Sequence, residues 1–409
     1  MDKLYVGIDV GSLDNSAYIM RPDGEKHSSF PIQNSIEGAK TVSARVVAAL
    51  TELEITNAVI GIEATGVYGQ NLIYFLREDA ALKRFDRKFH VLNPKQVQKF
   101  KEAYPELPKT DAVDAFVIAD NLRFGRITKA VLEDDYRYDA LRTLTRARFF
   151  ATQNLVREKQ RFMNLLFLKC SGLAQDKAFS DNFGVAAMEL YSYFETPDTL
   201  AKMSVKELSA FLAEKGKNRF PDPDKVAKAV IAAAKNSYSL PDPVNASVSQ
   251  AISISTSSIR ATQAQIKALD AEIERQFENI PNVLTSVRGI GPVYSAGIIA
   301  EVGNIDRFSG QASLAKYAGL AWTRHQSGTF EGENTRLIKS GNKFLKYYLC
   351  EAAFSLVRCD TEYKSYYNLK YKEVNKYQHK RALALTARKL VRLIFRLLKD
   401  NRLYKPASA

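Results

Sequence analysis

The stretch LYVGIDVGSLDNSAYIM, residues 4–20, opens with an apolar run over residues 4–10 and continues with a second over residues 16–20. The sequence RPDG, residues 21–24, is typical of a turn and leads to a third strand-like segment over residues 27–32. Three short strands joined by tight connections predict a β-meander at the start of the chain.

The following hundred residues alternate between helix and strand patterns, with Gly125 placed to end the last helix. We expect helices at 37–53, 68–76 and 111–124, and strands at 58–63 and 89–92. A meander followed by helix, strand, helix, strand and helix is the order of a ribonuclease-H-like α/β domain. We assign this domain to residues 1–130.

The middle of the chain predicts two long helices. Residues 138–168 contain neither Pro nor Gly, and residues 247–280 carry isoleucine and leucine at roughly heptad positions. We therefore expect a coiled-coil-like region over 131–280, with a helical insertion at 171–244. An ordinary helical bundle without a dimerising role fits the same pattern.

The third expected domain covers residues 281–409 and is mostly α-helical and basic. It ends in a helix over 381–399, whose leucines and isoleucine oppose arginines and a lysine. The chain has a net charge of +14, and residues 335–409 hold 18 Lys or Arg against 5 Asp or Glu. Such a concentrated basic excess favours a nucleic-acid partner, although a solvated basic surface is the simpler alternative.

The composition argues against several kinds of metal site and against a membrane location. The three cysteines and four histidines are scattered, which argues against a disulfide framework and a zinc site. Without a run of about 18 apolar residues or a signal peptide, the sequence predicts no membrane association and a cytoplasmic location, in a bacterial or archaeal cell and near its DNA. Any metal would need oxygen ligands.

Four carboxylates stand out by position. Asp9 ends the first strand and Glu63 ends the fourth, each next to glycine, while Asp111 and Asp114 lie in KTDAVDA, residues 109–115. The i, i+3 spacing of the two aspartates puts them on one helix face. Functional groups of α/β folds commonly lie at the ends of strands.

Massed carboxylates repel one another unless a cation neutralises them, and oxygen-only ligand sets suit Mg²⁺ or Mn²⁺. Two such ions can activate an attacking oxygen and stabilise the leaving oxygen of a phosphodiester. Each acid also has an ordinary explanation: Asp111 as a helix N-cap, Asp114 as a favourable first-turn charge, Glu63 as a solvated strand end.

With these acids in this order, the chain resembles the insertion sequence 110 family of transposases, whose relatives include pilin-gene-inverting recombinases. The resemblance implies a RuvC-like N-terminal domain in which Asp9, Glu63, Asp111 and Asp114 are catalytic metal ligands. It also implies donor and target DNA, a structured noncoding bridge RNA as guide, and dimers that form a tetramer on DNA. Residues 171–244 carry no matching motif.

The C-terminal motifs extend the resemblance. A GIGP sequence at 289–292 resembles the hairpin of a helix-hairpin-helix, in which Gly289 and Gly291 would let backbone N–H groups hold a DNA phosphate. In RHQSG, residues 324–328, Ser327 matches the family's serine nucleophile, which forms a covalent phosphoserine intermediate. Ser340 is the rival serine, and a plain turn is the alternative for the Ser-Gly pair.

A poor nucleophile such as a serine hydroxyl needs activation, which His325, nearby arginines or the metal could supply. Polar and basic side chains around the serine are expected to hold nucleic acid: Arg324, Arg336, Lys339, Asn342, Lys343 and Lys346. Beyond them, residues 363–380 interleave tyrosine and lysine, a composition that suits phosphates and stacked bases, or alternatively a core with solvated lysines.

Three other functions remain open at this point. A RuvC-like junction resolvase would use water as the nucleophile, so that Ser327 would be only a turn residue. A sugar-kinase or actin-like ATPase shares a motif like GIDVGS, residues 7–12, but a second phosphate loop and an adenosine-binding Gly-Gly are not found. A non-catalytic nucleic-acid-binding protein would not need the four carboxylates.

Overall fold

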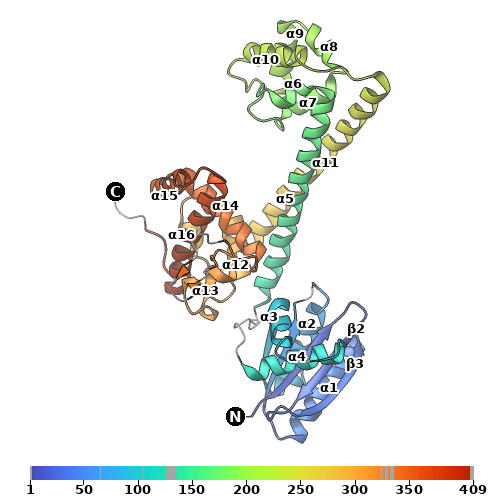
Figure 1. The fold of residues 1–409 in the computed structure, drawn as a ribbon, viewed down its shortest axis with the longest axis vertical. Helices are drawn as coiled ribbons and strands as arrows, with labels where there is room; N and C mark the ends of the chain where they lie inside the picture. Colours follow the sequence, from blue (N-terminus) through green and yellow to red (C-terminus); the bar gives the residue numbers. More distant parts are fainter. Residues whose placement is uncertain are drawn as a thin grey trace. The chain divides into compact units, whose positions relative to one another are not determined.

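The computed structural model describes residues 2–64, 66–104, 106–125, 135–323 and 336–405, and only the backbone of 326–327 and 330–331. The chain divides into two compact units, Met1–Tyr136 together with Gly303–Ser313, and Arg137–Val302 together with Leu314–Ala409. Each unit is described separately below, and many of their elements are labelled in Figure 1.

A five-stranded mixed sheet forms the centre of the first unit, in the order β3-β2-β1-β4-β5. The first three strands are antiparallel, as a meander requires, while β4 pairs parallel with both β1 and β5. The strands are β1 (Leu4–Val10), β2 (Asp14–Met20), β3 (Lys26–Gln33), β4 (Asn57–Glu63) and β5 (Asp86–Leu92). The ribonuclease-H-like α/β fold expected from the sequence is confirmed.

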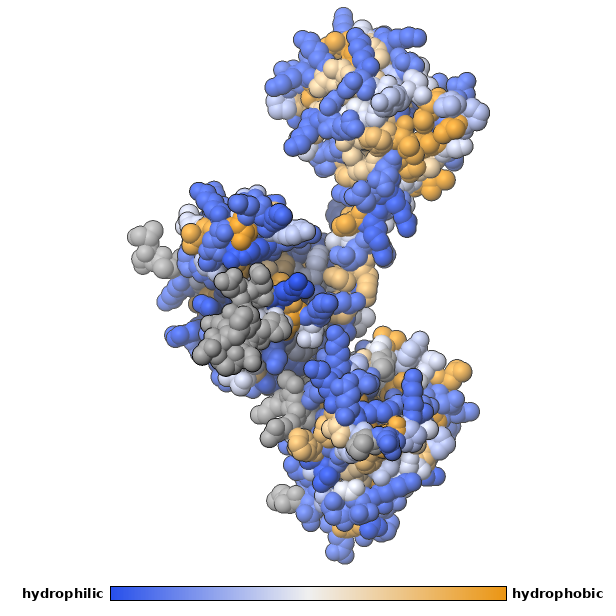
Figure 2. Space-filling model, viewed as in Figure 1, coloured by the Kyte–Doolittle hydropathy of each residue, from blue (hydrophilic) through white to orange (hydrophobic). Residues whose placement is uncertain are grey.

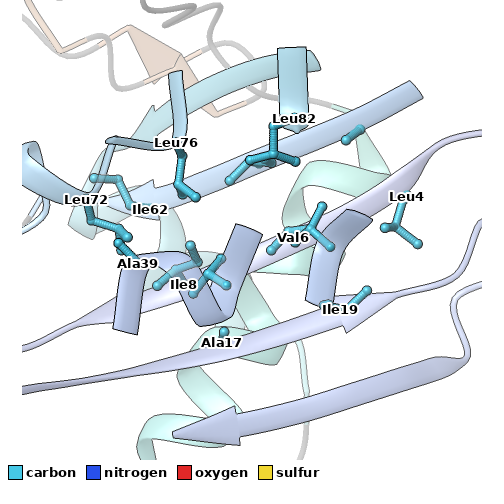
Figure 3. Close-up of a cluster of buried hydrophobic side chains, with 14 of the residues drawn as sticks. Leu4, Val6, Ile8, Ala17, Ile19, Ala39, Ile62, Leu72, Leu76 and Leu82 are labelled. Carbon is cyan, nitrogen blue, oxygen red and sulfur yellow. The ribbon is translucent and has the colours of Figure 1, made fainter. Parts of the chain in front are cut away.

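Alternation along β1 separates two faces of the sheet. Leu4, Val6 and Ile8 point to the face covered by α1 (Ile36–Glu52) and α2 (Gln70–Glu78), where they join the larger core (Figure 3). The opposite face packs a smaller cluster against α3 (Pro94–Lys101) and α4 (Asp111–Phe124). This second face is the one that carries the acidic residues.

The sequence predicted the α4 boundaries and missed α3. Gly125 ends α4 in the left-handed conformation, with φ 75°, which glycine adopts without steric cost. The missed α3 begins with Asn93 as N-cap, whose side chain accepts from the Lys95 N–H, and with Pro94 at its first position. An Asn-Pro pair is a known helix-start signal, so α3 was predictable.

Two long helices, α5 (Tyr136–Lys169) and α11 (Asp242–Phe277), lie side by side and antiparallel (Figure 1). Arg148 pairs with Asp270, and Ser255 donates to Glu158 at 2.6 Å. Between them in sequence, five helices form a lobe with its own core: α6 (Ser171–Gln175), α7 (Val185–Tyr193), α8 (Pro197–Lys202), α9 (Val205–Lys215) and α10 (Pro223–Lys235).

The C-terminal part of the second unit is built mainly from helices. They are α12 (Pro292–Val302), α13 (Gln311–Tyr317, of which the last four residues belong to this unit), α14 (Lys343–Cys359), α15 (Thr361–Lys372) and α16 (Gln378–Asp400). Two short strands, β6 (Gln326–Ser327) and β7 (Phe330–Glu331), pair antiparallel. Among the described residues, short 3-10 turns also occur at η1 (Leu82–Arg84) and η3 (Ile305–Arg307) of the first unit and at η2 (Leu284–Ser286) of the second. The expected long helices and mostly helical C-terminal region are therefore confirmed.

The surface visible in Figure 2 is mostly hydrophilic, as expected when most hydrophobic side chains are buried in the cores described above. In Figure 2 the visible face of each part is mostly hydrophilic, with hydrophobic side chains gathered in small patches. Among the described residues, no helix is both long enough and apolar enough to cross a lipid bilayer.

Candidate nuclease and strand-transfer sites

Asp9 and Glu63 reach the same edge of the sheet on neighbouring strands. The parallel register pairs Ile8 with Ile62, so the two acids follow directly at the next position. Adjacent strands lie about 4.8 Å apart. Side chains alternate along each strand, and both acids therefore point to the face covered by α4, away from the larger core.

Gly7 allows α4 to lie directly across β1. A Cβ atom at this position would come within 2.2 Å of the Ala115 carbonyl oxygen and 2.4 Å of the Ala119 nitrogen, both backbone atoms of α4. Only glycine fits such an approach. Since α4 begins beside the strand ends, its first turn is brought to Asp9 and Glu63.

The first turn of α4 presents Asp111 and Asp114. Thr110 is the N-cap of the helix, and its hydroxyl accepts from the Val113 N–H. Asp111 is therefore not the N-cap, which removes the capping explanation for that residue. The positive end of the helix dipole favours both acids at this end.

The electrostatics of these residues show that they act on one another. Burial raises the pKa of Asp9, and the negative charges of Asp114 and Asp111 raise it further, while the Val10 N–H and Lys101 lower it. Burial likewise raises the pKa of Glu63, with added contributions from Asp9 and Asp114. The fold therefore brings all four sequence-predicted acids into one cluster, called the four-acid cluster below.

Lys101, at the end of α3, is the functional candidate that the sequence did not indicate. Its Nζ lies 2.6 Å from Asp114 Oδ1. A single lysine among several near residue 100 has no distinguishing spacing, and only the packing of α3 against α4 selects it.

The residues of the four-acid cluster suit a divalent cation by chemistry. All donors are carboxylate oxygens, the ligands that Mg²⁺ and Mn²⁺ prefer. The mutual repulsion seen in the pKa values of Asp9 and Glu63 is what such a cation would relieve. Across the described parts of the chain, no three His, Cys, Asp or Glu side chains already converge as a ligand set, so the acids would have to close around an ion.

The third acidic residue of α4, Asp120, has a structural role. Asp120 is buried, accepts a short hydrogen bond from the Tyr104 hydroxyl, and pairs with Arg123 Nε at 2.8 Å. Burial and the Asp120 contact raise the pKa of Tyr104 to about 12. The contact between Tyr104 and Asp120 holds the segment after α3 against α4, the helix that carries Asp111 and Asp114.

In the second unit, the GIGP turn lies before α12 and lines a hollow of about 530 Å³. Gly289 has φ 98°, a conformation that favours glycine, whereas a Cβ on Gly291 would meet no atom within 4 Å. Arg148 and Arg288 line the same hollow. These contacts place basic side chains beside the turn.

Asn342 has an internal role that sequence reasoning did not foresee. Its Oδ1 accepts from the Phe344 and Leu345 N–H groups as the N-cap of α14. Its Nδ2 donates to Glu301 Oε2 at 2.6 Å, and the buried Glu301 also pairs with Arg146 at 2.7 and 2.9 Å. This network anchors the start of α14.

The expected nucleic-acid-binding side chains near this anchor differ in exposure. Arg336, Lys339 and Lys343 are exposed, as is the rival serine Ser340, while Lys346 is half-buried. Lys343 Nζ lies 5.2 Å from the ring centre of Phe150 and 5.0 Å from that of Phe344. Arg336, Lys339 and Lys343 therefore present positive charge at the surface.

Ser327 lies in β6, where its backbone pairs with Phe330, but its side chain lies outside what the structure describes. Arg324 and His325 also lie outside the described residues. The backbone on either side of residues 324–335 is paired. The Thr323 N–H donates to Arg336 O at 2.8 Å, and the Ile338 N–H donates to Ala321 O at 2.9 Å.

The tyrosine- and lysine-rich stretch is partly internal. Tyr363 is buried, and Lys389 lies over the rings of Tyr363 and Tyr366. Tyr371 and Tyr377 are exposed. On α16, burial and the charge of Arg392 lower the pKa of Arg388.

Comparison with known families matches both ends of the chain. Residues 6–169 match a family model described as a transposase, the DEDD transposase of IS110. Residues 282–368 match a second model, described as the transposase of the IS116/IS110/IS902 family.

Proteins similar over nearly the whole chain come from bacterial insertion elements. The 44.8 kDa protein of insertion element IS116 from Streptomyces clavuligerus is 27% identical, over 99% of this chain and 97% of its own length. The 42 kDa protein of IS900 from Mycobacterium paratuberculosis is 25% identical over 99% and 98%. With its two family domains in this order, the chain belongs to the IS116/IS110/IS902 family of transposases, which are phosphoryl-transfer enzymes.

Proposed function

We propose that this transposase cuts and rejoins DNA with a divalent-metal site in the N-terminal domain and a serine nucleophile in the C-terminal domain. The observation that supports the first half most is the four-acid cluster, in which each raised pKa has a neighbouring carboxylate among its causes. The proposal keeps the division into residues 1–130, 131–280 and 281–409.

Asp9, Glu63, Asp111 and Asp114 would hold Mg²⁺ or Mn²⁺. When bound, such ions supply activation of an attacking oxygen and stabilisation of a leaving oxygen. The residues themselves provide hard oxygen donors at the start of a helix and at the ends of two strands. Gly7 and Thr110 position them without taking part in the chemistry.

Ser327 would be the nucleophile. As its Oγ forms a bond to a DNA phosphorus, the serine hydroxyl gives up its proton. The bond from that phosphorus to a deoxyribose oxygen breaks, and the released oxygen takes up a proton to become a hydroxyl. The hydroxyl of a second DNA end then attacks the phosphoserine, which restores the serine and joins the DNA. The position of Ser327 within the family-matched residues 282–368 supports this assignment.

DNA donor and target are the expected substrates, and a structured bridge RNA is the expected guide. The basic excess of residues 335–409 supports a polyanionic partner. Exposed Arg336, Lys339 and Lys343 would contact phosphates. We also propose a homodimer that forms a tetramer on DNA, in which α5 and α11 offer extended surfaces for association.

DNA cleavage by purified protein with the RNA transcribed from the flanking element tests the metal site. We expect activity with Mg²⁺ or Mn²⁺, none with EDTA, and a loss of at least about 100-fold in Asp9→Asn and Glu63→Gln. Asp86→Asn is the control, because Asp86 begins β5 at the other end of the sheet. Activity that persists in EDTA or in both cluster variants would overturn the metal proposal.

The principal rival is a resolvase-like nuclease in which water attacks. It predicts undiminished cleavage in Ser327→Ala, whereas the serine proposal predicts loss of cleavage and of strand joining together.

A further inference from the structure

Lys101 places an ammonium group inside the four-acid cluster. Its Nζ is 2.6 Å from Asp114 Oδ1, and the two side chains are only 18% and 30% exposed. The same charge acts on Asp9, whose pKa it lowers. Partial burial weakens screening by water and salt, so this pair matters more to the cluster than an open surface pair would.

A divalent ion and this ammonium group would compete for the same carboxylate. Mg²⁺ binds carboxylate oxygen at about 2.0–2.1 Å. Two cations on one oxygen at such separations repel each other strongly. If Asp114 is a metal ligand, an inference that rests on the proposed function, Lys101 must leave Asp114 Oδ1 before the ion can bind there.

Lysine suits this exchange better than a fixed counter-ion does. Its ammonium group is strongly hydrated and sits on a flexible four-carbon stem. It can therefore move into solvent, or toward the phosphate of bound DNA, without any movement of α3. A divalent ion bound by several carboxylates can offset the loss of this single ion pair.

We propose that Lys101 is a positioning residue that neutralises Asp114 in the metal-free protein and is displaced by the divalent ion. Lys101 thereby sets the metal concentration at which the cluster fills. It keeps the acids together while no metal is bound, and it raises the concentration of metal needed for activity.

Mn²⁺ binding to the full chain without DNA tests this inference, measured from the electron paramagnetic resonance signal of free Mn²⁺. Lys101→Met removes the charge and keeps the length of the side chain. We expect it to bind Mn²⁺ about threefold to tenfold more tightly than wild type. Lys99→Met, an exposed lysine of the same helix, and Lys101→Arg, which retains the charge, should both keep the wild-type affinity.

Thermal unfolding provides a second measurement that does not depend on activity. In EDTA, Lys101→Met should unfold at a lower temperature than wild type, because the acids lose their counter-charge. Saturating Mn²⁺ should then raise its Tm by more than that of wild type. Circular dichroism at low temperature establishes that each variant is folded.

Each result has one interpretation. Unchanged or weaker Mn²⁺ binding by folded Lys101→Met, with binding still lost in Asp9→Asn, would overturn the role of Lys101 alone. Absence of Asp9-dependent Mn²⁺ binding in wild type and in Lys101→Met would overturn the proposed metal site as well.

Discussion

At the scale of single residues, a glycine positions the acidic site because it has no side chain. Gly7 lies on the α4 face of β1, two residues before Asp9, and α4 backbone atoms occupy the space that a Cβ would need. The distance between helix and strand, and so the distance between Asp9 and the α4 aspartates, depends on this glycine. Asp9 and its neighbours carry the proposed chemistry, and Gly7 allows them to lie close together.

Gly7→Ala should therefore damage both stability and the site. The new methyl group meets rigid backbone, which should lower the free energy of unfolding by about 3 kcal/mol and weaken Mn²⁺ binding in whatever remains folded. Chemical denaturation measures the first effect. Gly291→Ala is the control, since its Cβ would meet nothing within 4 Å, and it should change stability by less than about 0.5 kcal/mol. Equal effects of the two substitutions would contradict this account of Gly7.

Asp9→Asn should make the metal-free protein more stable. The raised pKa of Asp9 means that the folded state disfavours its ionised form. Its stabilising contribution is thus present at low pH and lost as the pH rises through the raised pKa. At neutral pH in EDTA we expect the asparagine variant to gain on the order of 0.5–1 kcal/mol. Thermal unfolding measures this gain in stability, and Asp86→Asn should show none. With Mn²⁺ present, the ion should stabilise wild type more than Asp9→Asn, so that the variant becomes the less stable protein.

At the scale of elements, local sequence signals predicted those helices and strands that carry a clear period or cap. The apolar run of β1 and the glycine after α4 gave their boundaries directly. The sequence reasoning missed α3 although Asn93-Pro94 marks its start. Lys101 could not be predicted, because its role depends on how α3 packs beside α4, not on spacing in the sequence.

Lys169, the last residue of α5, is a buried lysine that contacts the helical lobe and has a testable pH signature. Lys169 is 2% exposed, donates to the Tyr191 carbonyl at 3.1 Å, and lies 4.5 Å from the Phe194 ring centre. Burial lowers the pKa of this amine to about 8. The lobe matches no motif in the sequence. Lys169 is buried because it packs against Tyr191 and Phe194 of this lobe.

Lys169→Met should remove a rise of stability at alkaline pH. The folded-state pKa of about 8 lies below the ordinary value of 10.5. Between these two pH values the unfolded chain binds a proton that the folded chain does not, so stability rises with pH. We expect wild type to gain on the order of 2 kcal/mol across this window relative to the methionine variant. Urea denaturation at pH 7.5 and pH 10 measures the free energy of unfolding of both proteins. An equal change in this free energy between the two pH values for wild type and Lys169→Met would contradict the prediction.

At the scale of the whole molecule, the proposed chemistry is divided between sequence regions more than 200 residues apart. The sequence predicted the strands and the helix at whose ends the four acids lie. It could not predict that Asn342 serves as the cap of α14 and as a partner of Glu301. Such a role comes from packing between distant segments, and it shows that a polar residue near a motif need not touch the substrate.

A protein–DNA adduct on a denaturing gel tests most directly whether both halves act in one reaction. The assay combines protein, Mg²⁺, the flanking RNA, and labelled donor and target DNA, and compares wild type with Asp9→Asn and Ser327→Ala. Our account predicts an adduct in wild type that both substitutions abolish. Cleavage without an adduct, undiminished in Ser327→Ala, would contradict it and leave a nuclease that uses water.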